Sequence, residues 1–296
     1  MASGRPRVGY LGPEGTFSEE ALLASAAPDG VEPVPLGSIF ETVEALREGE
    51  LEWAIVPIEN SLEGSINETL DLLAGEAGGV EIVGEALLRV SHSLIAARRL
   101  ELAEIDTVVT HPQVPGQCAS FLRRELPHAR IVASSSTAEA VRTVVAAPAS
   151  GQAALGTLLA AEIYGGTVIR EGVQDRDDNE TRFVWLARTN GHAGPPPLRE
   201  EPDGGWKTSL VFWGLGAERP GWLVRCLDEF ASRSINLTRI ESRPLRERLG
   251  SYMFFVDLEG SIEDRPVADA LAGVRPLCEE LRVLGSYRAA PAKLPA

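Results

Sequence analysis

Short apolar runs alternate with polar turns and amphipathic stretches along the first part of the chain. Four apolar runs, each typical of a strand, are followed by a polar turn and a segment with helical spacing of its apolar residues. This alternation predicts βα units around a mostly parallel sheet. The apolar runs are 8–12, 53–58, 107–111 and 131–136, and the helical segments after them are 13–26, 59–75, 112–126 and 137–146.

One segment of this first part is too long to be a single ordinary strand. Residues 80–96 read VEIVGEALLRVSHSLIA, and we expect this stretch to cross between two lobes, with GTVIREGV returning near residue 170. The pattern therefore predicts a first lobe at about 1–85 and 170–188 and a second lobe at about 86–169. A cleft between two such lobes is a natural place for a ligand.

The pattern changes after a stretch rich in proline, glycine and charge. Residues 189–205, TNGHAGPPPLREEPDGG, have no apolar periodicity and predict a linker. The elements expected in 206–288 follow the order βαββαβ, which is the ferredoxin-like split unit. Cys226 lies on the apolar stripe of the first helix of this unit, so we expect it to be buried. Pro276 predicts a kink or a short break in the second helix.

Composition excludes several classes of protein. The formal net charge is -15 and no basic stripe exists, which argues against nucleic-acid binding. An anionic ligand would then need local positive potential from arginines or helix N-termini. The N-terminus lacks the apolar core of a signal peptide, and the apolar stretch 144–165 is too interrupted for a membrane span. Three distant cysteines without a C-x-x-C pair favour a reducing cytoplasm.

Common cofactor and metal motifs are absent from the sequence. Gly9, Gly12 and Gly15 have the spacing G-x-x-G-x-x-G, which is not the dinucleotide fingerprint, and 214–221 lacks the lysine of a P-loop. No H-E-x-x-H or G-x-S-x-G motif is present, and the histidines are scattered. We therefore expect neither a nucleotide cofactor, nor a metal, nor acyl-enzyme chemistry.

Polar residues collect at the ends of the expected strands. In DDNETRFVWLAR, Thr181 and Arg182 directly precede Phe183–Leu186, an unbroken apolar run that predicts a strand buried on both faces. Because open α/β sheets bind ligands at strand ends, the recurrence of such residues predicts one small anionic ligand held by neutral donors. The others are Thr16, which begins a capping box with Glu19; Glu59, Asn60 and Ser61; and Thr110, His111 and Gln117.

Five ordered stretches of the chain resemble the prephenate dehydratase family: GYLGPEGTFSEEA, VPIENSLEGSINETLDLL, HPQVPGQC, ALGTLLAAEIYG and NETRF. In the βαββαβ unit, ESRP resembles the ACT regulatory domain that is fused behind the enzyme in that family. The likeness extends from about Val8 to Tyr287. It implies an α/β fold, with a two-lobed periplasmic-binding-protein-like catalytic domain at 1–188 and a ferredoxin-like βαββαβ ACT domain at 206–288.

The resemblance also implies an activity and roles for individual residues. The family converts prephenate to phenylpyruvate in phenylalanine biosynthesis, with loss of carbon dioxide and hydroxide, and requires no cofactor or metal. Thr181 matches the catalytic threonine of the T-R-F motif. Residues that match or flank positions for substrate binding are Thr16, Glu59, Asn60, Ser61, Thr110, His111, Gln117, Arg182 and Phe183, and Arg182 is a candidate partner for a substrate carboxylate.

The C-terminal motifs imply feedback regulation. In the family, phenylalanine binds between paired ACT domains through G-A-L-V and E-S-R-P stretches, so the resemblance implies phenylalanine as effector and a homodimer or homotetramer. Glu241, Ser242, Arg243 and Pro244 match the second stretch, whereas the first reads Gly221, Trp222, Leu223 and Val224. Trp222 is much larger than the alanine of the family motif. Three consequences are open at the level of sequence: its side chain fills the pocket, changes the ligand of the pocket, or points into a neighbouring subunit.

Two alternatives remain open at the level of sequence. Arogenate dehydratase uses a substrate that differs in an amino rather than a keto side chain. A non-enzymatic sensor, either a transcription regulator or a solute-binding protein, would use a similar two-lobed domain. A regulator would need a basic helix-turn-helix and a solute-binding protein an export signal, and neither is recognisable here.

Overall fold

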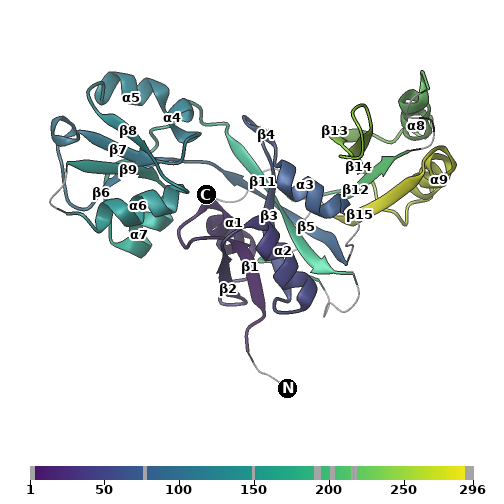
Figure 1. The fold of residues 1–296 in the computed structure, drawn as a ribbon. Helices are drawn as coiled ribbons and strands as arrows, with labels where there is room; N and C mark the ends of the chain where they lie inside the picture. The colour runs from purple at the N-terminus through teal and green to yellow at the C-terminus, as the bar shows by residue number, and fades with distance from the viewer. Residues whose placement is uncertain are drawn as a thin grey trace.

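Two α/β lobes and a C-terminal domain make up the protein, each built around its own β-sheet (Figure 1). The structure, a computed structural model, describes residues 4–75, 79–148, 151–189, 195–200, 204–214, 216 and 219–290. The C-terminal domain packs on the first lobe, on the opposite side from the second lobe (Figure 1). The predicted α/β class with two lobes is therefore confirmed.

The sheet of the first lobe is mixed rather than mostly parallel. Its strands lie in the order β2 (Glu32–Leu36), β1 (Arg7–Leu11), β3 (Trp53–Asn60), β11 (Glu180–Arg188) and β5 (Val80–Arg89), and β4 (Gly64–Ser65) pairs with β3. β1 runs parallel to both of its neighbours, but β11 runs antiparallel to β3 and β5. The expectation of a mostly parallel sheet was wrong because β11 enters this sheet from the second lobe.

Both faces of this sheet are covered. Helix α1 (Phe17–Ser25) packs on one face, and α2 (Ile39–Glu48) and α3 (Asn67–Ala74) pack on the other together with the C-terminal domain. Phe183 and Trp185 of β11 lie in the core beside α1, whereas Val184 and Leu186 lie in the core beside α2 and the C-terminal domain. The apolar run of β11 is thus buried on both faces, as its sequence predicts.

The second lobe is formed between two crossings of the chain. Its strands lie in the order β10 (Thr167–Arg170), β6 (Ser93–Ala96), β9 (Gln152–Gly156), β7 (Thr107–Thr110) and β8 (Arg130–Ala133). Because β5 and β6 belong to different sheets, the chain crosses at residues 90–92 and returns between β10 and β11. Its helices are η1 (Leu102–Glu104), α4 (Val114–Gln117), α5 (Ala119–Glu125), α6 (Thr137–Val145) and α7 (Leu158–Tyr164).

The C-terminal domain has the predicted ferredoxin-like topology. Its elements are β12 (Trp206–Trp213), α8 (Trp222–Ala231), β13 (Leu237–Pro244), β14 (Tyr252–Glu259), α9 (Arg265–Val274) and β15 (Glu280–Arg288), and its strands lie in the order β13, β14, β12, β15. Cys226 is fully buried in its core. Helix α9 ends at Val274, and the 3₁₀-helix η2 (Arg275–Leu277) follows, so the break predicted at Pro276 is confirmed.

Part of the expected linker is packed on the first lobe. Ala27 donates a backbone hydrogen bond to Pro197 at 2.8 Å, Arg199 donates one to Ser25 at 2.8 Å, and Leu198 packs against the core beside α1. Residues 190–194 and 201–203 of the expected linker lie outside the described residues. None of the helices among the described residues has the length and apolar content of a membrane-spanning helix.

The C-terminal sheet and the first lobe share one apolar core. Val211, Phe255 and Leu284 of the C-terminal domain pack in the same cluster as Val184 and Leu186 of β11. The backbones of β15 and β5 lie close together at Gly285. A Cβ atom added to Gly285 would overlap the carbonyl oxygen of Ile82, so this contact requires a residue without a side chain.

We expect Gly285→Ala to destabilise the protein. The added methyl group has no space in the shared core, and such overpacking costs about 1–3 kcal/mol of unfolding free energy. Chemical denaturation followed by tryptophan fluorescence measures this change. Gly205→Ala is the control, since a Cβ atom there meets nothing within 4 Å, and an equal loss in both variants would contradict the prediction.

Candidate active site

A cavity of about 870 Å³ lies between the two lobes. The first lobe lines it with the loop from β1 to α1 and with the ends of β3 and β11, and the second lobe lines it with α4 and the start of α6. Thr181, the second residue of β11, lines this cavity. The strand end predicted to meet a ligand therefore opens into a cavity large enough for a small molecule.

The hydroxyl of Thr181 is held by a neighbouring amide. Asn60 lies opposite Thr181 in the pairing of β3 with β11, and its Nδ2 donates to Thr181 Oγ1 at 2.9 Å. The Oδ1 atom of Asn60 accepts from the backbone N–H groups of Leu62 and Glu63 at 2.9 and 3.0 Å, which fixes the orientation of the amide. Because Thr181 Oγ1 accepts from Asn60, its own O–H remains oriented to donate elsewhere.

A bulge in β3 places Asn60 on the side of the cavity. Arg182 pairs with Glu59 but Phe183 pairs with Pro57, so Ile58 is an extra residue in β3. Ile58 packs in the core beside the C-terminal domain, and regular alternation would turn Asn60 to that same face. The bulge shifts the alternation by one residue and brings Asn60 to the face that carries Thr181.

Hydrogen bonds between amides connect Thr181 with the second lobe. Asn60 Nδ2 also lies 2.9 Å from Asn179 Oδ1, and Asn179 Nδ2 donates to Gln117 Oε1 at 3.3 Å. The Nε2 atom of His92 lies 2.9 Å from the same oxygen of Gln117. Since a carbonyl oxygen only accepts, Nε2 of His92 carries the proton. Burial lowers the pKa of His92, and the bond to Gln117 opposes this shift.

Two helix N-termini face the cavity from opposite lobes. Thr16 caps α1 and Ser136 caps α6, and both residues line the cavity together with the first residues of their helices. The first backbone N–H groups of a helix have no acceptor within the helix, and they carry partial positive charge. Each N-terminus is thus suited to an anionic group of a ligand.

Charged side chains give the cavity little positive potential. Glu14, Glu63 and Glu139 line it, and Arg142 is the one arginine among its described lining residues. Arg142 is already paired with Glu139 at 2.7 Å. An anionic ligand would therefore depend on neutral donors and on the two helix N-termini. Among the described residues, no group of three or more His, Cys, Asp or Glu side chains could hold a metal ion.

Five of the residues expected at the site line the cavity, namely Thr16, Asn60, His111, Gln117 and Thr181. The others expected for substrate binding are placed elsewhere in the structure. Thr110 is buried and donates to the backbone oxygen of Leu155 at 2.9 Å, and Phe183 lies in the core beside α1. Ser61 Oγ accepts from the backbone N–H of Glu180 at 3.0 Å.

Arg182 and Glu59 face away from the cavity. Arg182 is 8% exposed, and its guanidinium contacts Glu85, Asp257 and Tyr287, so the expected pairing with a substrate carboxylate does not match its position. Glu59 lies 3.7 Å from Arg182 and does not line the cavity. The physical reason is the alternation of side chains along a strand, which turns Arg182 to the face opposite Thr181.

Sequence reasoning missed His92 and Asn179. His92 lies within the segment that was expected to cross between the lobes, and residues at such a crossing are close to the cleft. Asn179 belongs to the same NETRF stretch as Thr181. The sequence thus contained a signal for both residues, namely the crossing segment for His92 and the NETRF stretch for Asn179. Neither residue lies at the end of one of the four apolar runs, unlike Asn60 and His111.

A second cavity of about 170 Å³ lies in the C-terminal domain. Gly221, Trp222, Leu223 and Val224 all line it. Trp222 is 3% exposed, and its Nε1 donates to the backbone oxygen of Leu277 at 2.6 Å. The indole also packs against Phe212 and Phe254 of its own domain. Trp222 thus forms a wall of the cavity and does not project from the surface.

The ESRP stretch lies apart from this second cavity. Glu241, Ser242, Arg243 and Pro244 are in β13 and are not among its lining residues. Glu241 Oε2 accepts from Ser65 Oγ of the first lobe at 3.1 Å. Arg243 donates to Asp71 in α3, and Ser242 and Pro244 are exposed. Two of the four residues therefore contact the first lobe of the same chain.

The buried neutral state of His92 predicts a pH-dependent stability. Because burial lowers its pKa below the ordinary value of 6.5, the unfolded chain binds a proton there at a higher pH than the folded chain does. The unfolding free energy of the wild type should therefore fall more steeply than that of His92→Gln as the pH drops below about 6.5. Urea denaturation at several pH values measures this, with substitution of the exposed His128 by glutamine as control; equal slopes in wild type and His92→Gln would contradict it.

Comparisons with known proteins agree on one family. A family model for prephenate dehydratase matches residues 8–191. A prephenate dehydratase of Mycobacterium sp. (strain KMS) is 41% identical over 292 residues, which cover 95% of this chain and 89% of that protein.

Solved structures extend the likeness to the C-terminal domain. Prephenate dehydratase from Arthrobacter aurescens, in complex with L-Phe, has a TM-score of 0.85 and 36% identity over 98% of this chain and 93% of that one. GqqA, described as a novel type of quorum quenching acylase, has a TM-score of 0.82 and 30% identity over 96% of this chain and 98% of that one. By the family match and the 41% identity over nearly its whole length, the chain belongs to the prephenate dehydratase family.

Proposed function

We propose that this protein converts prephenate to phenylpyruvate, with Thr181 as the residue that assists departure of the ring hydroxyl. The observation that carries this proposal is the position of Thr181. Its side chain lies in a cavity between the lobes, accepts from Asn60, and keeps its own O–H available as a donor. Membership of the prephenate dehydratase family supports the same activity.

The reaction breaks two bonds of the substrate. The bond to the ring carboxylate breaks and releases carbon dioxide, and its electron pair enters the ring while the bond from the opposite ring carbon to its hydroxyl breaks. Negative charge therefore develops on the leaving oxygen. A hydrogen bond from Thr181 Oγ stabilises that charge, and the bond from Asn60 Nδ2 stabilises the charge drawn onto Oγ. Aromatisation of the ring supplies the driving force.

The two helix N-termini suit a substrate with two carboxylates. Prephenate carries one on its ring and one on its side chain, and α1 and α6 offer backbone N–H groups from opposite walls of the cavity. Binding of one carboxylate by each lobe would hold the ring between them beside Thr181. Such positioning contributes to catalysis by limiting the orientations of the substrate.

We also propose that the C-terminal domain is an ACT domain that binds phenylalanine as a feedback inhibitor. Its βαββαβ topology, the cavity lined by Gly221–Val224 and the L-Phe complex of the Arthrobacter relative support this assignment. Near this cavity, Val224 and Tyr252 are 68% and 43% exposed, and β13 is an edge strand that bears Ile240, 48% exposed. These apolar surfaces support pairing with a second copy as a homodimer or homotetramer.

We expect Thr181→Ala to lower kcat by about 100-fold, because one donor to the developing charge is lost. Thr181→Ser retains a hydroxyl and should keep most of the rate. The measurement is the appearance of phenylpyruvate from purified prephenate, with circular dichroism to check that each variant is folded. An unchanged kcat in Thr181→Ala would remove this residue from the mechanism.

Phenylalanine should bind to the wild type and inhibit it. Val224→Trp places a large side chain at the rim of the smaller cavity, and we expect it to abolish both the heat of binding in calorimetry and the inhibition. Val224 is exposed, so this substitution leaves the core of the domain intact. Absence of heat and of inhibition in the wild type at millimolar phenylalanine would refute the effector assignment.

A further inference from the structure

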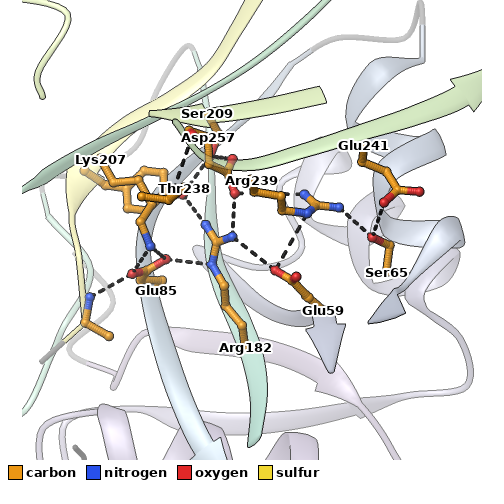
Figure 2. Close-up of polar contacts among 12 residues, drawn as sticks. Glu59, Ser65, Glu85, Arg182, Lys207, Ser209, Thr238, Arg239, Glu241 and Asp257 are labelled. Carbon is orange, nitrogen blue, oxygen red and sulfur yellow. Dashed lines mark hydrogen bonds and ion pairs between the residues drawn. The ribbon is translucent and has the colours of Figure 1, made fainter. Parts of the chain in front are cut away.

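An ionic network with a buried centre joins the C-terminal domain to the first lobe (Figure 2). Its charged members come from both domains in equal numbers. The first lobe contributes Arg182, Glu59 and Glu85, and the C-terminal domain contributes Lys207, Arg239 and Asp257.

Arg182 is at the centre of this network. Its Nε donates to Glu85 at 2.7 Å, its Nη1 donates to Asp257 at 2.6 Å, and its Nη2 donates to the hydroxyl of Tyr287 at 2.7 Å. All three partners are buried, so these charge-assisted bonds are shielded from water. The guanidinium is therefore fixed on three sides, twice by the C-terminal domain and once by β5.

Strand pairing connects the network with the reacting groups. Arg182 follows Thr181 in β11, Glu59 precedes Asn60 in β3, and the two pairs lie opposite each other in the sheet. On one face, Asn60 donates to Thr181; on the other, Glu59 lies 3.7 Å from Arg182. The same ionic network therefore contacts β3 and β11 on the face opposite Asn60 and Thr181.

We propose that Arg182 is a positioning residue for Thr181, and that the seating of the C-terminal domain sets the geometry of the Thr181–Asn60 pair through this network. This inference rests on the proposed function. Arg182 does not line the cavity, so it acts on the reaction through the backbone of β11. The C-terminal domain thereby becomes part of the support of the active site.

The charges of the network explain why the two domains are coupled at this point. The first lobe alone carries one cation and two anions here, and the C-terminal domain carries two cations and one anion. Separation would leave buried charges uncompensated, which is strongly unfavourable. A displacement of the C-terminal domain therefore draws Arg182 with it. Burial raises the pKa of Asp257, but the charges of Arg182 and Arg239 lower it by more. The pKa of Asp257 therefore lies below its ordinary value, and this carboxylate stays charged.

Strand β13 extends the network toward the ESRP stretch. Arg239 lies 3.7 Å from Glu59 and donates to Ser65 Oγ at 2.9 Å, and Glu241 accepts from the same hydroxyl at 3.1 Å (Figure 2). A change in the position of β13 would therefore act on β3 and β4 of the first lobe. Since Glu59 precedes Asn60, this series of contacts ends next to Asn60, the residue that donates a hydrogen bond to the Thr181 hydroxyl.

A double-mutant cycle tests the inference. Asp257→Asn removes the charge that faces Arg182. Tyr287→Phe removes the hydrogen bonds of the Tyr287 hydroxyl to Arg182 and Ser209 while keeping every charge and the packing of the ring. Each of these two substitutions is introduced into the wild-type chain and, separately, into the Thr181→Ala variant. If Arg182 acts through Thr181, each substitution lowers kcat with Thr181 present, by about tenfold for Asp257→Asn, and by less than about twofold in the Thr181→Ala chain.

The outcomes separate positioning from a merely structural role. Equal losses of kcat in both backgrounds, or an unchanged kcat in both folded variants, would overturn the inference. Tyr287→Phe decides the matter if Asp257→Asn does not fold. Asp71→Asn is the matched control. It removes the charge that pairs with Arg243 and Arg246 at the same domain interface but on α3, and kcat should be unchanged.

A measurement without substrate separates this inference from the proposed function. Hydrogen exchange followed by mass spectrometry should show faster exchange in residues 179–183 of Tyr287→Phe and no change there in Asp71→Asn. Unchanged exchange in Tyr287→Phe would count against positioning even in an active enzyme. A different result is a wild type that forms no phenylpyruvate while residues 179–183 still exchange faster in Tyr287→Phe. That result would refute the proposed function and leave the positioning role intact.

Discussion

Alternation of side chains along β11 puts the cavity and the domain interface on opposite faces of one strand. Thr181 faces the cavity, and Arg182 faces the C-terminal domain. The same alternation continues into the core, where Phe183 packs beside α1 and Val184 packs beside the C-terminal domain. One strand thus supplies Thr181 to the cavity and Arg182 and Val184 to the domain interface, so neither can be rearranged without the other.

The bulge in β3 makes this arrangement possible on the neighbouring strand. Ile58 and Glu59 both face the C-terminal domain, which leaves Asn60 to face the cavity. A regular β3 would either bury the amide of Asn60 in the apolar core or withdraw Glu59 from Arg182. The extra residue therefore serves the hydrogen bond to Thr181 and the ionic network at the same time.

The parts that follow from local pattern could be predicted from the sequence, and the parts that depend on distant partners could not. The doubly buried run of β11, the polar residue at its start and the ferredoxin-like order of elements are local. Strand β2 was not predicted. It contains Pro33 and Pro35, which disfavour a central strand, and it lies at the sheet edge, where proline is tolerated. Arg182 was a candidate partner for a substrate carboxylate, because its contact with Asp257, 75 residues away, does not follow from local pattern.

The seclusion of Arg182 also has a consequence for the proposed reaction. Decarboxylation removes negative charge from the ring carboxylate as the transition state forms. A full cation beside that group would stabilise the substrate more than the transition state, and would therefore slow the step. Helix N-termini carry only partial charge and offer the weaker interaction that this carboxylate needs in order to leave. Arg182, on the face of β11 opposite the cavity, can hold Thr181 in place without stabilising the substrate carboxylate against decarboxylation.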